Sequence, residues 1–382
     1  MIYKPIYGQF ANEIGEMSGV YDNDSLLVKI RCSKMSTTYS RCLMQVNTGY
    51  EEFSINGLVG AAVKAEVLGY DSFSTNETSH NPYLPLVLAA EHTKKIGLRT
   101  SIALSFARSP MDTAYLSWDL QNLSKGRFVL GLGSQVRGHI VRRFSLPWAP
   151  PAPRMREYIS ALKEIWSCWQ NGTKLNFAGD HYSFNLMPPF FNPGPIEFPD
   201  IKIFIAGVNP NMLKVAGELC DGVLLHSFNT PLYTREVILP NIKKGAQKTD
   251  RSLDDIDISG GGFIVTGRND EDLDEAIKDT KNRIAFYAST RSYGEIMRVH
   301  GWEDVHENLY RMSVDGKWAE MGSLITDDML SHFAVTGTYE EIAGKIKSTY
   351  GPYASSISFS MDVKSDEDEI ALKGIVAEIR KK

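Results

Sequence analysis

From Arg41 to the end of the chain, short apolar segments alternate with longer segments in which apolar residues recur at helical spacing. Alternation of this kind is typical of a parallel sheet whose strands are connected by helices. Eight strands in about 340 residues fit a closed (β/α)8 TIM barrel with insertion segments. The predicted strands are Cys42–Val46, Asp71–Thr75, Thr100–Phe106, Phe128–Leu132, Ile203–Ala206, Gly222–His226, Ile256–Val265 and Ser356–Ser360.

A doubly wound open sheet is the alternative architecture. Such a sheet usually carries a G-x-G-x-x-G fingerprint at its first turn, and Val136 stands where that pattern needs glycine. The barrel is therefore the preferred prediction. Its helices are expected at Ile55–Leu68, Tyr83–Lys95, Pro110–Lys125, Arg154–Trp169, Pro210–Leu219, Thr234–Thr249, Asp270–Ala288, Thr338–Tyr350 and Glu367–Lys381.

Composition excludes several classes of protein. A formal charge of −5 and a pI near 6.0 provide no basic field for nucleic acid. No apolar run approaches the length of a membrane span, and no secretory signal is expected. The four cysteines are scattered without metal-ligand spacing, so we expect no metal site and a cytoplasmic protein.

The chain divides into two regions of different character. Residues 1–40 are polar and lack a sustained period, which indicates an appended arm or a start codon placed too early, with Met35 as the true beginning. Residues 41–382 form the predicted barrel domain. Within it, residues 289–335 are expected to be an inserted helical segment.

The stretch Gly126–Ser134 places bulky apolar residues between glycines and ends without a side chain at Gly133. This pattern fits a strand buried on both faces. One interpretation is a core strand followed by a tight turn. The other is a strand whose carboxyl end, bare of side chains, meets a ligand, since ligands bind at the carboxyl ends of parallel strands.

The loop after the second strand carries Glu77 and His80 within four residues. Helix capping by Ser79 or Asn81 is one interpretation of this polar loop. Capping does not account for Glu77 with His80, so both are predicted to be functional. Arg108, after the third strand, is interpreted as a solvated residue at a helix start.

Two further loops are candidates for anion binding. After the fourth strand, a small polar segment leads to Arg137, Arg142 and Arg143, which form either a solvated helix face or a basic rim for an anionic tail. After the fifth strand, Ala206, Gly207, Val208 and Asn209 run directly into a helix beginning at Pro210. Backbone N–H groups at a helix N-terminus bind phosphate well, although a capped turn is the alternative.

Four motifs, in this order along the chain, resemble the luciferase-like superfamily of flavin and deazaflavin enzymes. They are Gly69–Phe73, Gly126–Ser134, Arg154–Tyr158 and Ala216–Gly222. The stretches Glu77–Leu86 and Phe106–Pro110 resemble a subgroup usually assigned to the deazaflavin coenzyme F-420.

The resemblance implies where a cofactor would lie. Family members carry a bulge with a non-prolyl cis peptide at the end of the third strand, which by position falls at Ser101–Ile102 beneath the ring. The loop Ala206–Asn209 would hold the cofactor phosphate. Ser134 and Gln135 would contact the ring and ribityl side, and Gly133 would leave space for the flat ring. His139, in the segment that follows, is included among the cofactor-binding candidates.

Three functions remain open at this point. The first is an F-420-dependent oxidoreductase that moves a hydride to or from a small organic substrate, with Glu77 or His80 transferring the proton. The second is a monooxygenase that uses reduced FMN and O2. The third is a non-catalytic barrel, because Thr78 and Val136 stand where relatives place a catalytic His and Glu. Dimers are usual in the superfamily, so a homodimer is expected.

Overall fold

The computed structural model describes residues 43–50 and 55–381, all of which belong to one compact unit spanning residues 39–382. The expected N-terminal extension, including Met35, lies outside the described residues.

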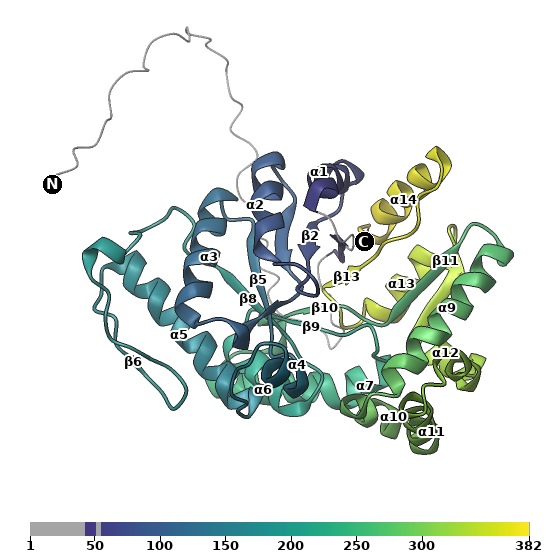
Figure 1. Cartoon of the computed structure of the whole chain (residues 1–382). Helices are drawn as coiled ribbons and strands as arrows, with labels where there is room; N and C mark the ends of the chain where they lie inside the picture. Colours follow the sequence, from purple (N-terminus) through teal and green to yellow (C-terminus); the bar gives the residue numbers. More distant parts are fainter. Residues whose placement is uncertain (1–42, 51–54, 382) are drawn as a thin grey trace, which may run out of the picture. The chain divides into compact units, whose positions relative to one another are not determined.

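Eight parallel strand positions close into a barrel (Figure 1). Each strand pairs in parallel with its neighbours, and pairing of the third position with β5 completes the circle. The predicted (β/α)8 fold is confirmed. The barrel strands are β1 (Gln45–Tyr50), β2 (Ser72–Thr75), β3 (Gly97–Thr100) extended by β4 (Ala103–Leu104), β5 (Phe128–Gly133), β8 (Lys202–Ala206), β9 (Gly222–Leu224), β10 (Asp257–Ser259) and β13 (Ser356–Ser358).

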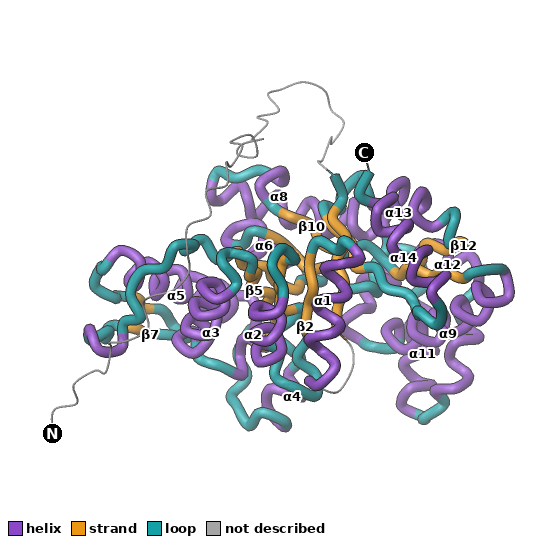
Figure 2. The backbone as a smooth tube through the Cα atoms, turned by 90° about the horizontal axis from the view of Figure 1, so that it is seen from above, coloured by secondary structure: helices purple, strands orange, loops and turns teal. Residues whose placement is uncertain are grey.

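Helices surround these strands (Figure 2). Local sequence signals set several of their ends. The hydroxyl of Ser109 caps α3 by accepting from the Met111 N–H, and Pro110 occupies the first turn, where its missing donor costs nothing. The helix α1 ends at Gly69, whose φ of 87° favours glycine. The helices around the barrel are α1 (Leu58–Leu68), α2 (Tyr83–His92), α3 (Pro110–Leu123), α4 (Arg137–Arg142), α5 (Pro151–Asn171), α6 (Pro210–Leu219), α7 (Pro231–Tyr233), α8 (Leu239–Ala246), α13 (Ile342–Tyr350) and α14 (Asp366–Ile379).

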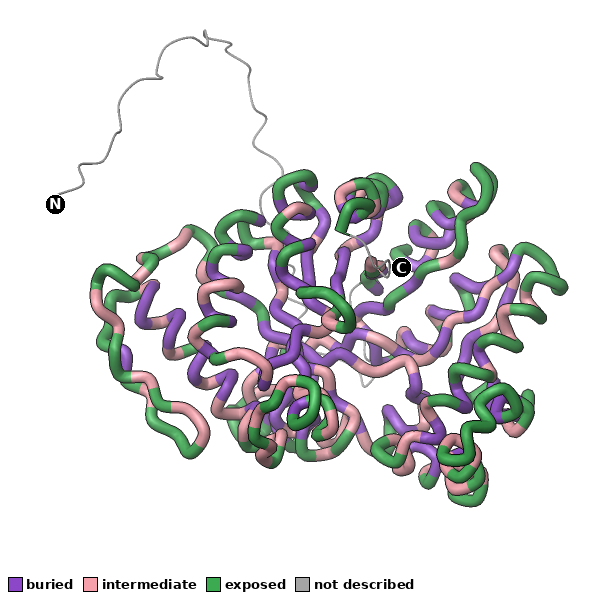
Figure 3. The backbone as a smooth tube through the Cα atoms, viewed as in Figure 1, coloured by how far each residue is buried: buried purple, intermediate pink, exposed green. Residues whose placement is uncertain are grey.

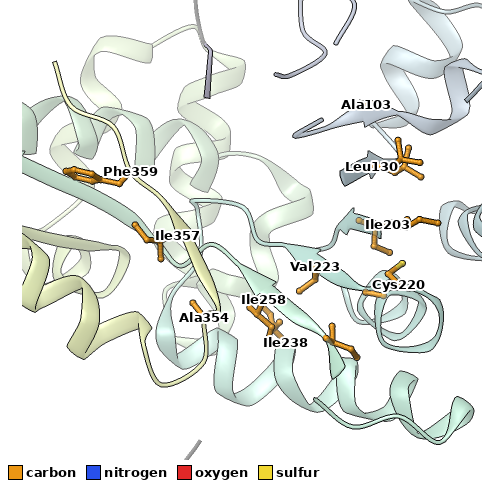
Figure 4. Close-up of a cluster of buried hydrophobic side chains, with 14 of the residues drawn as sticks. Ala103, Leu130, Ile203, Cys220, Val223, Ile238, Ile258, Ala354, Ile357 and Phe359 are labelled. Carbon is orange, nitrogen blue, oxygen red and sulfur yellow. The ribbon is translucent and has the colours of Figure 1, made fainter. Parts of the chain in front are cut away.

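Figure 3 shows buried residues along the barrel strands and on parts of the surrounding helices, and most of these buried residues are apolar. Figure 4 shows one cluster, in which Leu130, Ile203 and Val223 of adjacent strands lie near Cys220 and Ile238 of the helical layer. All five are 2% exposed or less. Each buried aliphatic side chain contributes about 1.5–3 kcal/mol relative to exposure, so this layer holds the strand ends in place.

The predicted strand Ile256–Val265 is wrong as a single element. The chain forms β10, then passes through Gly260–Gly262 and leaves the barrel as β11 (Phe263–Gly267). Gly260 has a φ of 114° and a Cβ on Gly262 would lie 2.5 Å from Phe333 O, so glycines make this exit possible.

Strand β11 pairs in parallel with β12 (Ala334–Thr338), which lies between the expected helical insertion 289–335 and the expected helix Thr338–Tyr350 and overlaps the ends of both. The helix there starts later, at Ile342. Between β11 and β12 the chain is helical and forms α9 (Asp270–Ala288), α10 (Gly294–Val299), α11 (Glu303–Val314) and α12 (Asp327–Phe333).

The predicted strand Thr100–Phe106 is interrupted at Ser101–Ile102, where the resemblance implies a bulge, and it ends in a 3-10 turn at Ser105–Ala107 that was not expected. A short antiparallel hairpin, β6 (Phe177–Ala178) with β7 (Ser183–Phe184), was also not expected. None of the helices in the described residues is long and apolar enough to span a membrane.

Candidate active site at the carboxyl ends of the barrel strands

Glu77 and Arg108 form a buried ion pair at this end of the barrel. Nη1 and Nη2 of the Arg108 guanidinium both donate to Glu77, at 2.7 Å to Oε2 and 2.8 Å to Oε1 respectively. The Leu104 N–H also donates to Glu77 Oε2, at 2.7 Å. The two side chains are 8% and 14% exposed, so the pair is largely shielded from water. Arg108 is therefore a partner of Glu77 rather than the solvated residue that we expected.

The ion pair affects the protonation of Arg108. Burial alone would lower the pKa of the Arg108 guanidinium, but its hydrogen bonds and charge interaction with Glu77 outweigh this and raise the pKa. Both carboxylate oxygens of Glu77 are occupied by these donors. Glu77 thereby ties the loop after β2 to the segment that follows β3.

The peptide bond Ser101–Ile102 is cis, as the resemblance implies. Strand β2 and the loop after it hold this segment. Ser101 N donates to Thr75 O at 2.7 Å, and Glu77 N donates to Ile102 O at 3.2 Å. A Cβ on Gly133 would lie 2.5 Å from Ile102 Cδ1, so the space beside Gly133 is taken by Ile102. The expectation that this glycine leaves room for a flat ring is wrong: its missing side chain makes room for Ile102.

The loop after β5 contains Ser134 and Gln135, both partly buried. Gln135 adopts a left-handed φ of 56°, and its side chain accepts from the Val136 N–H. In α4, which follows, His139 lies 3.5 Å from an Arg143 nitrogen. Arg143 also donates to Thr78 O at 2.6 Å, which brings the loops after β2 and β5 together.

The loop after β8 leads directly into the N-terminus of α6. Asn209 occupies the cap position, but its side chain makes no cap hydrogen bond. The Val208 carbonyl accepts from Tyr233 OH at 3.1 Å, and this hydrogen bond links the loop to α7. Ala206, Gly207, Val208 and Asn209 thus present backbone at an open helix N-terminus, the arrangement that favours an anion.

His80, the other predicted catalytic residue, lies exposed in the loop after β2. Its neighbour Asn81 accepts from the N–H groups of Tyr83 and Leu84 and so caps the start of α2. The capping interpretation therefore holds for Asn81 and leaves His80 available. Among the described residues, no group of three or more His, Cys, Asp or Glu side chains is arranged to hold a metal ion.

Sequence reasoning missed His226, which follows β9 at the same end of the barrel. Its Nδ1 accepts from the Phe228 N–H at 2.9 Å, and its ring lies against Tyr287 and Tyr293. Burial, with a smaller contribution from the nearby Arg283 charge, lowers the pKa of His226 to about 4. A histidine at the end of a predicted strand was the signal available in the sequence.

Sequence reasoning also missed Arg99, which lies on β3. Its Nη1 donates to Ser259 Oγ of β10 at 3.1 Å. In the strand order β10 is separated from β3 by β2, β1 and β13, so the side chain crosses the barrel interior. Burial lowers the pKa of Arg99 to about 10, so the guanidinium stays protonated at neutral pH.

Comparison with known proteins agrees with this geometry. The family model for luciferase-like monooxygenases matches residues 36–355, and the chain belongs to this family. An uncharacterized protein of Mycobacterium tuberculosis is 46% identical over 287 residues, covering 75% of this chain and 84% of that protein. A 5,10-methylenetetrahydromethanopterin reductase of Archaeoglobus fulgidus is 27% identical over 289 residues, covering 74% and 82%.

Solved structures show the same fold. An F-420-dependent tetrahydromethanopterin reductase from Methanopyrus kandleri superposes with a TM-score of 0.71 at 22% identity, over 89% of this chain and 98% of that one. The oxygenating constituent of a diketocamphane monooxygenase from Pseudomonas putida, in complex with FMN, has a TM-score of 0.62 at 16% identity, over 88% and 98%. The chain is an oxidoreductase of the luciferase-like family, and its relatives point to a deazaflavin or flavin cofactor.

The Glu77–Arg108 pair should contribute substantially to stability. We expect Glu77→Gln to lower the free energy of unfolding by about 3 kcal/mol, because it leaves a buried guanidinium without its charge partner. The control is Glu369→Gln, which breaks the exposed Lys64–Glu369 pair and should cost under about 1 kcal/mol. Urea unfolding measures both. Equal losses in the two variants would contradict the assigned importance of the buried pair.

His226 should make stability depend on pH. The unfolded state protonates this ring near pH 6.5, whereas the folded state does so near pH 4, so stability is full above pH 6.5 and is lost as the pH falls towards 4. The loss from this group is on the order of 3 kcal/mol.

A suitable variant is His226→Asn, whose amide oxygen can still accept from the Phe228 N–H. Its unfolding free energy should change less between pH 7 and pH 4.5 than that of the wild type. His92→Asn, at an exposed helix end, controls for the loss of one imidazole. An unchanged pH dependence in His226→Asn would refute the assignment.

Proposed function

We propose that this protein is an oxidoreductase that uses the deazaflavin F-420 to transfer a hydride to or from a small organic substrate. The observation that carries the proposal is the pairing of two features at one end of the barrel. These are the cis peptide at Ser101–Ile102 and the open helix N-terminus after Gly207–Asn209. In the family that this chain resembles, the segment at the first position lies beneath the cofactor ring, and an open helix N-terminus suits a phosphate. The F-420-dependent relatives favour the deazaflavin over FMN.

The residues at this end of the barrel fit such a cofactor in type. Val208 and Asn209 would offer backbone N–H groups to the phosphate, and Gly207 lets this loop pack against Leu213 and Val223. Ser134 and Gln135 would contact the ring and ribityl side, Ser101 and Ile102 would support the ring, and His139 would lie at the rim. The exposed Arg137 and Arg142, in α4, would attract the acidic tail. Bound there, the deazaflavin would supply hydride chemistry.

The protein itself would handle the proton. Glu77 is saturated by Arg108 and the Leu104 N–H, so we assign it a positioning role for the segment that carries the cis peptide. His80 is exposed in the same loop and is free to donate or accept a proton at an imidazole nitrogen. This division of roles refines the expectation that either residue transfers the proton.

A cofactor titration tests the proposal. We expect F-420 to bind, as measured by saturable quenching of its fluorescence. Gly207→Ala should weaken binding roughly tenfold, equivalent to about 1.4 kcal/mol, because the added Cβ would lie 3.2 Å from Leu213 Cδ2 and 3.6 Å from Val223 Cγ2 and would shift the backbone that carries the N–H groups. The control is Gly344→Ala, where an added Cβ meets nothing within 4 Å. Tight binding of reduced FMN, with oxygen consumption and no response to F-420, would overturn the proposal in favour of a monooxygenase. Binding of neither would favour a non-catalytic barrel.

The role of His80 is tested by turnover. With reduced F-420 as the donor and whichever acceptor a screen identifies, His80→Gln should lower kcat by about 10²–10⁴-fold, the usual contribution of a positioned acid or base. Cofactor affinity should be unchanged. Wild-type kcat in this variant would exclude His80 as the proton-transfer group.

A further inference from the structure

Arg99 is a buried cation without an anionic partner. Its side chain lies in the barrel interior, and the residue is 5% exposed. Within the described residues its only hydrogen bond is the one to Ser259 Oγ, and Arg99 forms no ion pair there. Its Nε is buried and has no hydrogen-bond partner. A guanidinium has five N–H donors, so most of the hydrogen-bonding capacity of Arg99 is unused.

A second arginine shows how this chain satisfies a guanidinium that has a structural role. Arg127, just before β5, donates five hydrogen bonds of 2.8–3.0 Å. Four go to the backbone carbonyls of Ala90, Thr93, Ile96 and Ser124. Arg127 stands at the amino-terminal end of the barrel, where residues serve stability. The unused donors of Arg99 therefore do not reflect a general tolerance for unpaired arginines.

Arg99 lines a small cavity of about 110 Å³ at the carboxyl ends of the strands. Ser101 of the cis peptide, Ser227 and Ser259 also line it. Ser259 Oγ already accepts from Arg99 and from Ser356 Oγ, so its own proton is left to donate. The cavity can hold a few water-sized groups, which is too little for a fused ring and enough for a carboxylate on a short chain. Backbone of Gly260–Gly262 forms another wall.

Burying an unpaired charge destabilises a protein. A carboxylate would offset that cost, because its two oxygens match the fork of a guanidinium. We propose that this cavity is the anion subsite of the substrate pocket, and that the substrate is a small organic acid whose carboxylate binds Arg99. The identity of the acid as substrate rests on the proposed function, whereas the subsite itself does not.

Anion binding to the cofactor-free protein tests the subsite. Acetate is the probe, acetamide is its uncharged isostere, and ionic strength is held constant with sodium chloride. We expect acetate to raise the Tm of the wild type saturably, by about 2 °C or more, and acetamide to have no such effect. Arg99→Met should bind acetate at least about tenfold more weakly, whereas Arg127→Met should bind it as the wild type does.

Stability without acetate separates the subsite from a purely structural role. Arg99→Met removes the unpaired charge and should leave the Tm unchanged or higher, while Arg127→Met should lower it. A lower Tm in Arg99→Met, together with an acetate response equal to that of the wild type, would overturn the proposal. So would the absence of any saturable acetate response in the wild type.

A parallel F-420 titration keeps the two proposals apart. Arg99→Met should keep its affinity for F-420 while losing the acetate response. If acetate has no effect and Arg99→Met instead weakens F-420 binding, the guanidinium serves the cofactor and the subsite proposal is wrong. If the wild type binds acetate through Arg99 but does not bind F-420, the subsite stands and the proposed function fails.

Discussion

The barrel closes where Thr100 meets Gly131. The Thr100 hydroxyl donates to Gly131 O at 2.8 Å and accepts from Gly131 N at 2.9 Å. A Cβ on Gly131 would lie 1.8 Å from Thr100 O, so no other residue allows this approach. The two strands that form this seam are those that complete the eight-membered circle. The glycine-rich strand is therefore required first by the closure of the barrel.

The same seam places the candidate active site. Directly after Thr100 come Ser101 and Ile102, and β4 then pairs again with the end of β5. Ile102 fills the space that Gly133 leaves. Glu77, in the loop after β2, pairs with Arg108 and also accepts a hydrogen bond from the Leu104 N–H of β4. Thr100 of the barrel closure, the cis segment Ser101–Ile102 and Arg108 of the ion pair all lie in one short stretch of chain. The stability of the barrel and, under the proposed function, the placement of the cofactor ring therefore depend on the same contacts.

The alternation of strand-like and helical segments was sufficient to predict the eight strand positions of the barrel, although the bounds of the third and seventh strands differ from the prediction. The sequence pattern failed where a strand pairs with a segment that is distant in the sequence. The pairing of β11 with β12 joins Phe263 to Ala334, and no local pattern distinguishes that pairing from a longer barrel strand. The same limit applies to side chains: Arg108 was predicted to be solvated because its partner, Glu77, lies thirty-one residues away.

The resemblance identified the position of the cis peptide, but it did not reveal Arg99. A charged residue next to a predicted strand is usually solvated, and only the strand order shows that it faces Ser259 across the barrel.

The two arginines show what distinguishes the ends of this barrel. Arg127 interacts with the charge of Glu66, and it donates four hydrogen bonds to backbone carbonyls and one to the Thr93 hydroxyl. Arg99 has more protein around it and fewer partners. A protein selected for stability alone would replace such a residue with an apolar one, because an unpaired buried charge is costly. Its presence beside the cis segment is consistent with a site in which the ligand supplies the missing charge.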